Sequence, residues 1–123
     1  MEKEERDETM AKFRKQEIHV LICTDMIARG VDVPEAELVV NFDVPCKQKN
    51  SRSNEKCGDQ ETYLHRIGRT GRFGKQGLAI TLFDRADDKE HLDQIVKHYD
   101  MGAMVKQLEG ADHLKHLLAE IAD

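Results

Sequence analysis

The chain has 123 residues, of which 39% are hydrophobic, and its formal net charge is -5. A chain of this length supports one modest core and leaves little room for a second domain, and its acidic balance argues against non-specific nucleic-acid binding. No apolar run approaches the ~20 residues of a membrane span, and the start MEKEERDE lacks the chemistry of a signal peptide, so we expect a soluble intracellular unit.

The hydrophobic periodicity alternates between helix and strand along the chain. It predicts a charged helix over 7–15, apolar strands over 19–23, 37–42 and 77–83, and a helix from Glu61 to about Gly68. Such short apolar strands are typical of a parallel sheet buried on both faces. Two amphipathic helices follow, with Asp87 and Asp112 as expected N-caps and with apolar positions at Leu92, Ile95, Val96 and Tyr99 and at Leu114, Leu117, Leu118 and Ile121. The alternation predicts an α/β class with a mainly parallel sheet.

Three further features of the chain concern its completeness, its long polar segment and its cysteines. Three strands are few for such a domain, and the sequence opens inside a charged helix, so we expect an N-terminally truncated domain. The polar stretch CKQKNSRSNEKCGDQ at 46–60 has the composition of a flexible loop. The three cysteines, Cys23, Cys46 and Cys57, lack CxxC spacing, which favours reduced thiols over a zinc site or a disulfide framework.

The segment HRIGRTGR, residues 65–72, is the most informative part of the sequence. It lies in a stretch, 63–83, with four basic and no acidic residues, and a focused basic cluster in an acidic chain indicates a defined anionic ligand such as phosphate. The glycine spacing does not support a collagen repeat, because three triplets without proline cannot sustain a triple helix. A phosphate loop fails as well, because Arg69 stands where its first glycine is required and Gln76 replaces the Ser or Thr.

Two glycines in this segment determine where its arginines lie. Gly68 and Gly71 are expected to end the helix, so that Arg69 and Arg72 project from a turn. A guanidinium placed in this way is suited to bidentate phosphate contact, as in an arginine finger that is supplied to a nucleotide site from outside. The alternative is that these arginines are surface groups or pair with acids elsewhere in the fold.

Two motifs in the sequence resemble a known family. HRIGRTGR is similar to motif VI of the DEAD-box RNA helicases, CTDMIARGVDVP is similar to their motif V, and YLHRIGRTGRFGKQGLA extends the similarity without a gap. Arg6 resembles the arginine of the QxxR motif, although Lys3 stands where its glutamine is expected. The resemblance covers about residues 4 to 84, and the C-terminal helix pair more loosely. The long insert after VP is similar to the mRNA-export branch.

The resemblance implies a RecA-like three-layer α/β/α fold with a mainly parallel sheet. Residues 1–123 would form a partial helicase C-terminal domain, the truncated second lobe, with a flexible insert at about 46–60. Walker A, the DEAD tetrapeptide, the Q motif and the SAT motif are absent from this sequence, so ATP and Mg²⁺ would be held mainly by an N-terminal lobe. The full-length protein would be an ATP-dependent RNA helicase, and the chain alone would be inactive.

The resemblance also assigns roles to residues by position. The assigned sites are catalytic residues (Arg69, Arg72 and His65), nucleotide contacts (Asp32, Arg69 and Arg72), RNA-backbone contacts (Arg6, Thr24, Arg29 and Gly30) and coupling to the first lobe (His65 and Arg66). Expected partners are RNA bound through sugar and phosphate, ATP, the N-terminal lobe and nuclear-pore or mRNA-export regulators, with no membrane. The expected location is cytoplasmic and nuclear, at the nuclear pore.

Simpler interpretations accompany these assignments. Asp32 before Pro34 could form a turn, Thr24 could cap a helix, and His65 could be an interior histidine. His113 and His116 are more typical of a solvent-facing helix than of a metal site, and we expect no metal ligands. The basic residues of the insert, Lys47, Lys49, Arg52 and Lys56, leave open a solvated loop or a contact with RNA or a regulator. A binding module that has lost its partner lobe is the alternative to the enzyme.

Overall fold

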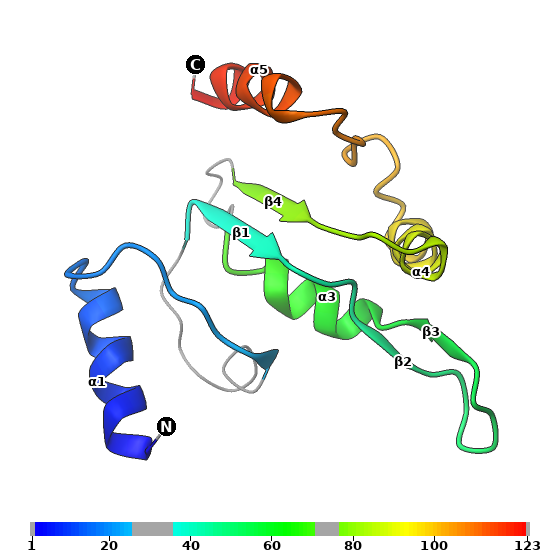
Figure 1. The fold of residues 1–123 in the computed structure, drawn as a ribbon, viewed down its shortest axis with the longest axis horizontal. Helices are drawn as coiled ribbons and strands as arrows, with labels where there is room; N and C mark the ends of the chain where they lie inside the picture. Colours follow the sequence, from blue (N-terminus) through cyan, green and yellow to red (C-terminus); the bar gives the residue numbers. More distant parts are fainter. Residues whose placement is uncertain (1, 26–35, 71–76, 123) are drawn as a thin grey trace. The chain divides into compact units, whose positions relative to one another are not determined.

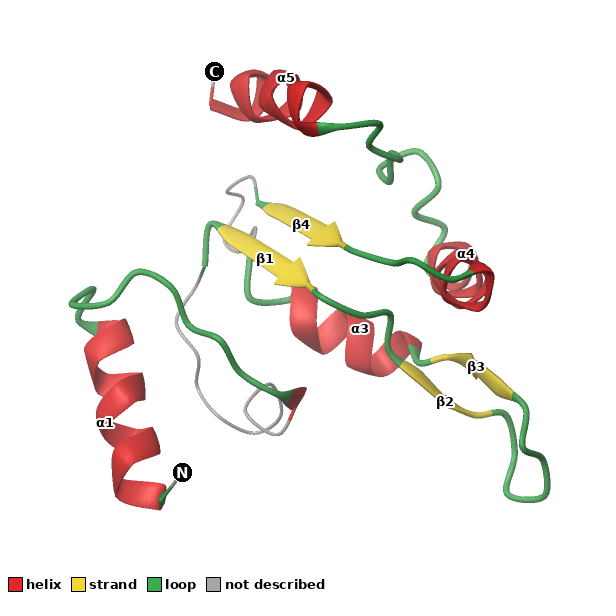
Figure 2. Ribbon diagram, viewed as in Figure 1, coloured by secondary structure: helices red, strands yellow, loops and turns green. Residues whose placement is uncertain are grey.

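The computed structural model describes residues 2–25, 36–70 and 77–122 (Figure 1). Its helices are α1 (Lys3–Arg14), α3 (Gln60–Ile67), α4 (Ala86–His98) and α5 (Ala111–Ala122), and its strands are β1 (Leu38–Asn41), β2 (Cys46–Gln48), β3 (Lys56–Gly58) and β4 (Leu78–Thr81) (Figure 2). The chain divides into two compact units: Met1–Phe42 with Glu61–Leu82, and Asp43–Gln60 with Phe83–Asp123. None of the described helices is both long and apolar enough to cross a bilayer.

The first unit is built on a parallel pair of strands. β1 and β4 pair in register from Leu38 opposite Leu78 to Asn41 opposite Thr81. Because side chains alternate along a strand, Asn41 and Thr81 share one face, on which the Asn41 Nδ2 donates to the Thr81 Oγ1 over 3.2 Å. Tyr63 of α3 is hydrogen-bonded to Thr81 on this face. The helix therefore covers the face on which Asn41 is buried.

The opposite face of this strand pair carries only apolar side chains. Leu38 and Val40 of β1 lie beside Leu78 and Ile80 of β4, and both β1 residues are more than a third exposed. The apolar runs that predicted strands at 37–42 and 77–83 therefore do form neighbouring parallel strands, as the sequence indicated.

The strand predicted over 19–23 is wrong. These residues have no regular secondary structure, and the side chains of Val20 and Ile22 are 76% and 88% exposed. A strand exists only where a neighbour completes its hydrogen bonds, and the residues that the structure describes supply no ladder partner for this segment. Hydrophobicity alone could not reveal this, because it measures the tendency to be buried rather than the presence of a neighbour.

The second unit contains an antiparallel hairpin packed on α4. β2 and β3 pair with Lys47 opposite Cys57, and the Gly58 amide donates to the Gln94 Oε1 over 2.8 Å. Ile95, on the same helix, is fully buried. The hairpin occupies most of the stretch that the sequence predicts to be a loop, so that segment has more regular structure than its polar composition indicates. Its flexibility stays a prediction.

The helix starts also differ from the expected ones. α1 begins at Lys3, before the predicted residue 7, because Glu2 and Glu5 form a capping box. The N-cap of α4 is Arg85, without a side-chain hydrogen bond, and Asp87 lies in the first turn. Asp112 likewise lies inside the first turn of α5. Neither aspartate is an N-cap, but an acidic side chain in the first turn still interacts favourably with the helix dipole.

Candidate functional site

Helix α3 carries the first half of the HRIGRTGR segment and has one buried and one exposed side. Thr62 and Tyr63 are buried, whereas Leu64 and His65 are exposed. Arg66 lies three residues after Tyr63 and therefore shares its inward side of the helix. His65 and Arg66, to which the resemblance assigns one coupling role, consequently face different surroundings.

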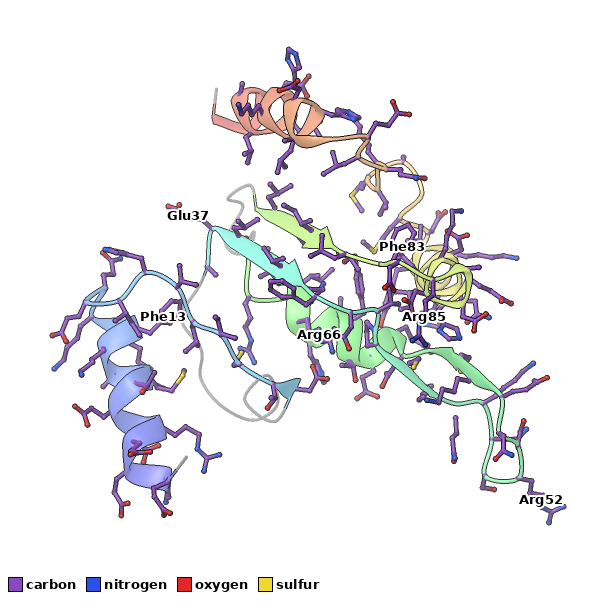
Figure 3. The ribbon with its side chains drawn as sticks, viewed as in Figure 1. Phe13, Glu37, Arg52, Arg66, Phe83 and Arg85 are labelled. Carbon is purple, nitrogen blue, oxygen red and sulfur yellow. The ribbon has the colours of Figure 1, made fainter. Side chains whose placement is uncertain are left out.

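Arg66 projects from α3 (Figure 3), and Asp25 holds its guanidinium. Its Nε donates to Oδ1 over 2.7 Å and its Nη2 donates to Oδ2 over 2.8 Å, which is a bidentate arrangement. The Arg66 side chain is 14% exposed and the Asp25 side chain 47%. The sequence left open whether arginines of this segment contact phosphate or pair with an acid elsewhere in the fold. Arg66 pairs with an acid. Its coupling to a first lobe stays a prediction.

Arg69 lies in the turn that follows α3, as the glycine pattern predicts. The Gly68 amide donates to the Leu64 carbonyl over 2.8 Å and closes the helix. The Ala36 amide then donates to the Arg69 carbonyl over 2.7 Å, and the Thr70 hydroxyl donates to the Glu37 carbonyl over 3.1 Å. The backbone that carries Arg69 is thus fixed to the residues just before β1.

Thr24 is exposed and lies directly beside the Asp25–Arg66 pair in the chain. The neighbouring Cys23 has a raised pKa, because partial burial and the Asp25 carboxylate disfavour the thiolate, while Arg66 partly offsets them. Cys23, Cys46 and Cys57 form no disulfide with one another in this structure, and their reduced state stays a prediction. The Cys23 thiol is therefore protonated at neutral pH and is not an activated nucleophile.

The structure brings some of the predicted site residues together and leaves others apart. Thr24, Arg66 and Arg69 belong to one group, linked through Asp25 and through the end of α3. Arg6 lies on α1, and within the described ranges no hydrogen bond or ion pair joins its side chain to this group. Arg29, Gly30, Asp32 and Arg72 lie outside the described residues, and their roles stay predictions.

The described residues contain no group of three or more His, Cys, Asp or Glu side chains that could hold a metal ion. His113 is half-buried and His116 is exposed on α5.

Sequence reasoning missed Asp25 and the backbone anchors at Ala36 and Glu37. The stretch around the arginines contains no acidic residue, and the carboxylate that pairs with Arg66 lies 41 residues away in the chain. One signal was available, since Asp25 directly follows Thr24 inside the motif V segment. Backbone anchors leave no signal in the side-chain sequence, because any residue except proline can donate the Ala36 hydrogen bond.

Comparison with known proteins identifies the domain. Residues 1–74 match the family described as helicase conserved C-terminal domain. The chain is 41% identical over 118 residues to the ATP-dependent RNA helicase dbp5 of Botryotinia fuckeliana, covering 95% of this chain and 24% of the relative. The chain thus spans about a quarter of that relative's length.

Two solved structures of Saccharomyces cerevisiae Dbp5 are similar to this fold. One, bound to RNA and ADP BeF3, has a TM-score of 0.78 and 31% identity over 100% of this chain and 30% of that chain. A second, bound to Gle1 and IP6, has a TM-score of 0.76 and 32% identity over 98% of this chain and 30% of that chain. The predicted RecA-like α/β fold class is confirmed. The family match spans more than half of the sequence, and the chain therefore belongs to the helicase conserved C-terminal domain family, as a lobe of the DEAD-box RNA helicase type similar to the Dbp5 mRNA-export branch.

Proposed function

We propose that this chain is the C-terminal lobe of an ATP-dependent RNA helicase that couples ATP binding and hydrolysis to RNA duplex unwinding or RNP remodelling in mRNA export. The observation that carries this proposal is the fixed position of Arg69. Its turn closes α3 and is tied by the 2.7 Å Ala36 to Arg69 hydrogen bond to the chain before β1. A guanidinium on a backbone that is already held in place stabilises developing phosphate charge without a rearrangement of that backbone.

The proposed nucleotide contacts are those of an incomplete site. Arg69 and Arg72 act as arginine fingers toward the γ-phosphate, Asp32 accepts from the ribose hydroxyl, and the exposed His65 couples this surface to the first lobe. The donor chemistry fits phosphate but does not fit Mg²⁺, for which the described part of the chain offers no carboxylate cluster. The other lobe is proposed to hold most of ATP and Mg²⁺, because Walker A and the DEAD tetrapeptide are absent from this sequence.

The proposed RNA contacts come from α1 and from residues 24–30. The exposed Thr24, with Arg29, Gly30 and Arg6, binds the sugar-phosphate backbone. Backbone contacts position RNA without reading its bases, so binding is expected to be independent of sequence. The similar structures support RNA, a nucleotide and a regulator as partners, since S. cerevisiae Dbp5 has been solved bound to RNA and ADP BeF3 and bound to Gle1 and IP6. The proposed location is cytoplasmic and nuclear, at the nuclear pore.

The experiment that tests the function is steady-state ATPase kinetics of the full-length protein at limiting and saturating RNA. Arg69→Ala and Arg72→Ala are each expected to lower kcat about 10³-fold, with little loss of RNA affinity in the open enzyme. Arg69→Lys rescues little, because a point charge does not reproduce the bidentate fork. Thr24→Ala has the opposite pattern, with weaker RNA affinity and a smaller change in kcat at saturating RNA.

A matched control is Arg52→Ala, which removes an exposed arginine from the hairpin and leaves kcat unchanged. The isolated 123-residue chain is expected to hydrolyse no ATP, since it lacks Walker A and the DEAD tetrapeptide. RNA-dependent turnover by the isolated chain contradicts the incomplete-site argument. Near-normal kcat with lost RNA affinity in both arginine variants means that the arginine cluster is an RNA-binding patch and not a pair of arginine fingers.

A further inference from the structure

The Asp25–Arg66 pair differs from the other ion pairs that we describe in its geometry and its burial. Two N–H···O contacts of 2.7 and 2.8 Å join the groups, and the arginine side chain is largely buried. Three other pairs, Lys12–Glu8, Lys49–Glu55 and Lys89–Asp93, have contacts of 3.3, 3.6 and 3.3 Å between side chains that are at least 49% exposed. Exposed pairs contribute little to stability, whereas a bidentate contact also fixes the relative orientation of its partners.

The pair joins two segments that have separate proposed tasks. Asp25 directly follows Thr24, and Arg66 lies one helical turn before Arg69, whose backbone is anchored at Ala36. The two halves of the pair are 41 residues apart in the chain. A displacement at Thr24 must therefore either carry the end of α3 with it or break two short hydrogen bonds.

We propose that the Asp25–Arg66 pair is a positioning contact that couples the RNA contact at Thr24 to the phosphate contact at Arg69. The inference rests on the proposed function, because it takes RNA and phosphate as the ligands of those two residues. Neither Asp25 nor Arg66 needs to touch a ligand in this role. RNA that fixes the segment at Thr24 fixes Asp25, the carboxylate holds the Arg66 fork, and the end of α3 presents Arg69 in one orientation.

A purely structural pair makes a different prediction from a coupling pair. If the contact only stabilises the fold, its loss lowers the melting temperature, and the protein that remains folded responds to RNA normally. If the contact couples the two sites, the folded variant loses part of its response to RNA. The discriminating quantity is therefore the ratio of RNA-stimulated to RNA-free kcat, measured together with the RNA concentration for half-maximal stimulation, well below the melting temperature.

The experiment uses the full-length protein with Asp25→Asn, Arg66→Lys and the double variant. Each single change is expected to lower the stimulation ratio about 5-fold or more, the lower end of typical coupling between sites. Lysine keeps the charge but loses the fork, so it is not expected to rescue. Because both changes remove the same contact, the stimulation ratio of the double variant falls no further than that of the single variant with the larger loss. Asp93→Asn, which breaks the exposed pair with Lys89, leaves the ratio unchanged and is the matched control.

Three results overturn the inference. Normal stimulation in both single variants, with only a lower melting temperature, makes the pair structural. Multiplicative losses in the double variant mean that the residues act separately. No RNA stimulation in the unsubstituted protein contradicts the proposed function, and this inference with it. If Asp25→Asn does not fold, Arg66→Lys carries the test, since it keeps a cation beside the carboxylate.

Discussion

The backbone amide of Gly58 donates to the Gln94 Oε1 over 2.8 Å and thereby attaches the β2–β3 hairpin to α4. The approach is so close that a Cβ on Gly58 would overlap the His91 carbonyl oxygen and lie 2.8 Å from the Ile95 Cγ1. A second bond within the same unit, from the Tyr99 hydroxyl to the Gln60 carbonyl over 2.9 Å, ties the end of α4 to the residues that follow β3. Only glycine therefore allows the hairpin to lie against this helix.

Gly58→Ala is expected to destabilise the chain by about 1–3 kcal/mol, the typical cost of overpacking. The reason is that the overlapped atom is a helix carbonyl, which cannot move away as a flexible side chain could. Urea denaturation followed by circular dichroism measures the change. Gly102→Ala is the control, because nothing lies within 4 Å of its Cβ position. Equal stability of the two variants would show that the hairpin does not pack on α4 in solution.

Asn41→Ala is expected to cost about 1–3 kcal/mol, because it leaves a buried polar contact without its partner. Asn41 is 4% exposed and donates to Thr81 across the β1–β4 pair. A double-mutant cycle with Thr81→Val isolates the contact, and the two losses should be less than additive. Asn50→Ala removes the exposed acceptor for the Arg52 amide and should cost less. Additive losses in the cycle contradict a direct contact.

Tyr63 is expected to make the fold sensitive to alkaline pH. Burial raises the pKa of its hydroxyl above the usual value, and the hydrogen bond with Thr81 opposes this effect only partly. Because the folded pKa lies above the unfolded one, this contribution to stability is complete below the unfolded pKa and is lost as the pH rises through the folded pKa. Urea denaturation can measure stability from neutral pH up to the alkaline range in which tyrosine ionises. Over this range, stability should fall more steeply for the unsubstituted chain than for Tyr63→Phe. Parallel curves contradict the raised pKa.

Cys46 and Cys57 are not expected to form an intramolecular disulfide under oxidation. Cys46 is opposite Gly58 and Cys57 is opposite Lys47, so the two thiols lie on opposite faces of the hairpin. Lys47→Cys places a thiol directly across from Cys57, within the spacing that a disulfide accepts, and should cross-link. Mass spectrometry after mild oxidation distinguishes the products. A Cys46–Cys57 bond in the unsubstituted chain means that the register is shifted by one residue.

The sequence predicts those parts of the fold whose cause is local. The apolar runs of β1 and β4, the span of α3 and its end before Gly68 follow from composition and turn chemistry, and the structure has all three. The exposed segment at Val20 and Ile22 was misjudged because a strand depends on its neighbours. The hairpin was missed because its residues are polar and the helix that anchors it lies more than 30 residues away, as the Gly58 to Gln94 bond illustrates.

The candidate site follows the same rule. The turn position of Arg69 follows from its flanking glycines, and the exposure of His65 agrees with its place on the outer side of α3. The bidentate partner of Arg66 could not be predicted from local chemistry, since Asp25 lies 41 residues away in the chain. Local chemistry thus identifies which residues carry charge, but tertiary contacts decide which of those charges are already neutralised.

The register of the two strand pairs sets an order for folding. Gln48 and Lys56 meet after a short turn, whereas Asn41 and Thr81 are 40 residues apart. Closing the longer loop costs about 1–2 kcal/mol more chain entropy, and non-local pairing slows folding. During synthesis the hairpin can therefore form before β4 has left the ribosome and paired with β1. Until then the apolar side chains of Leu38 and Val40 have no cross-strand partners, and this interval is when the nascent chain most needs protection from aggregation.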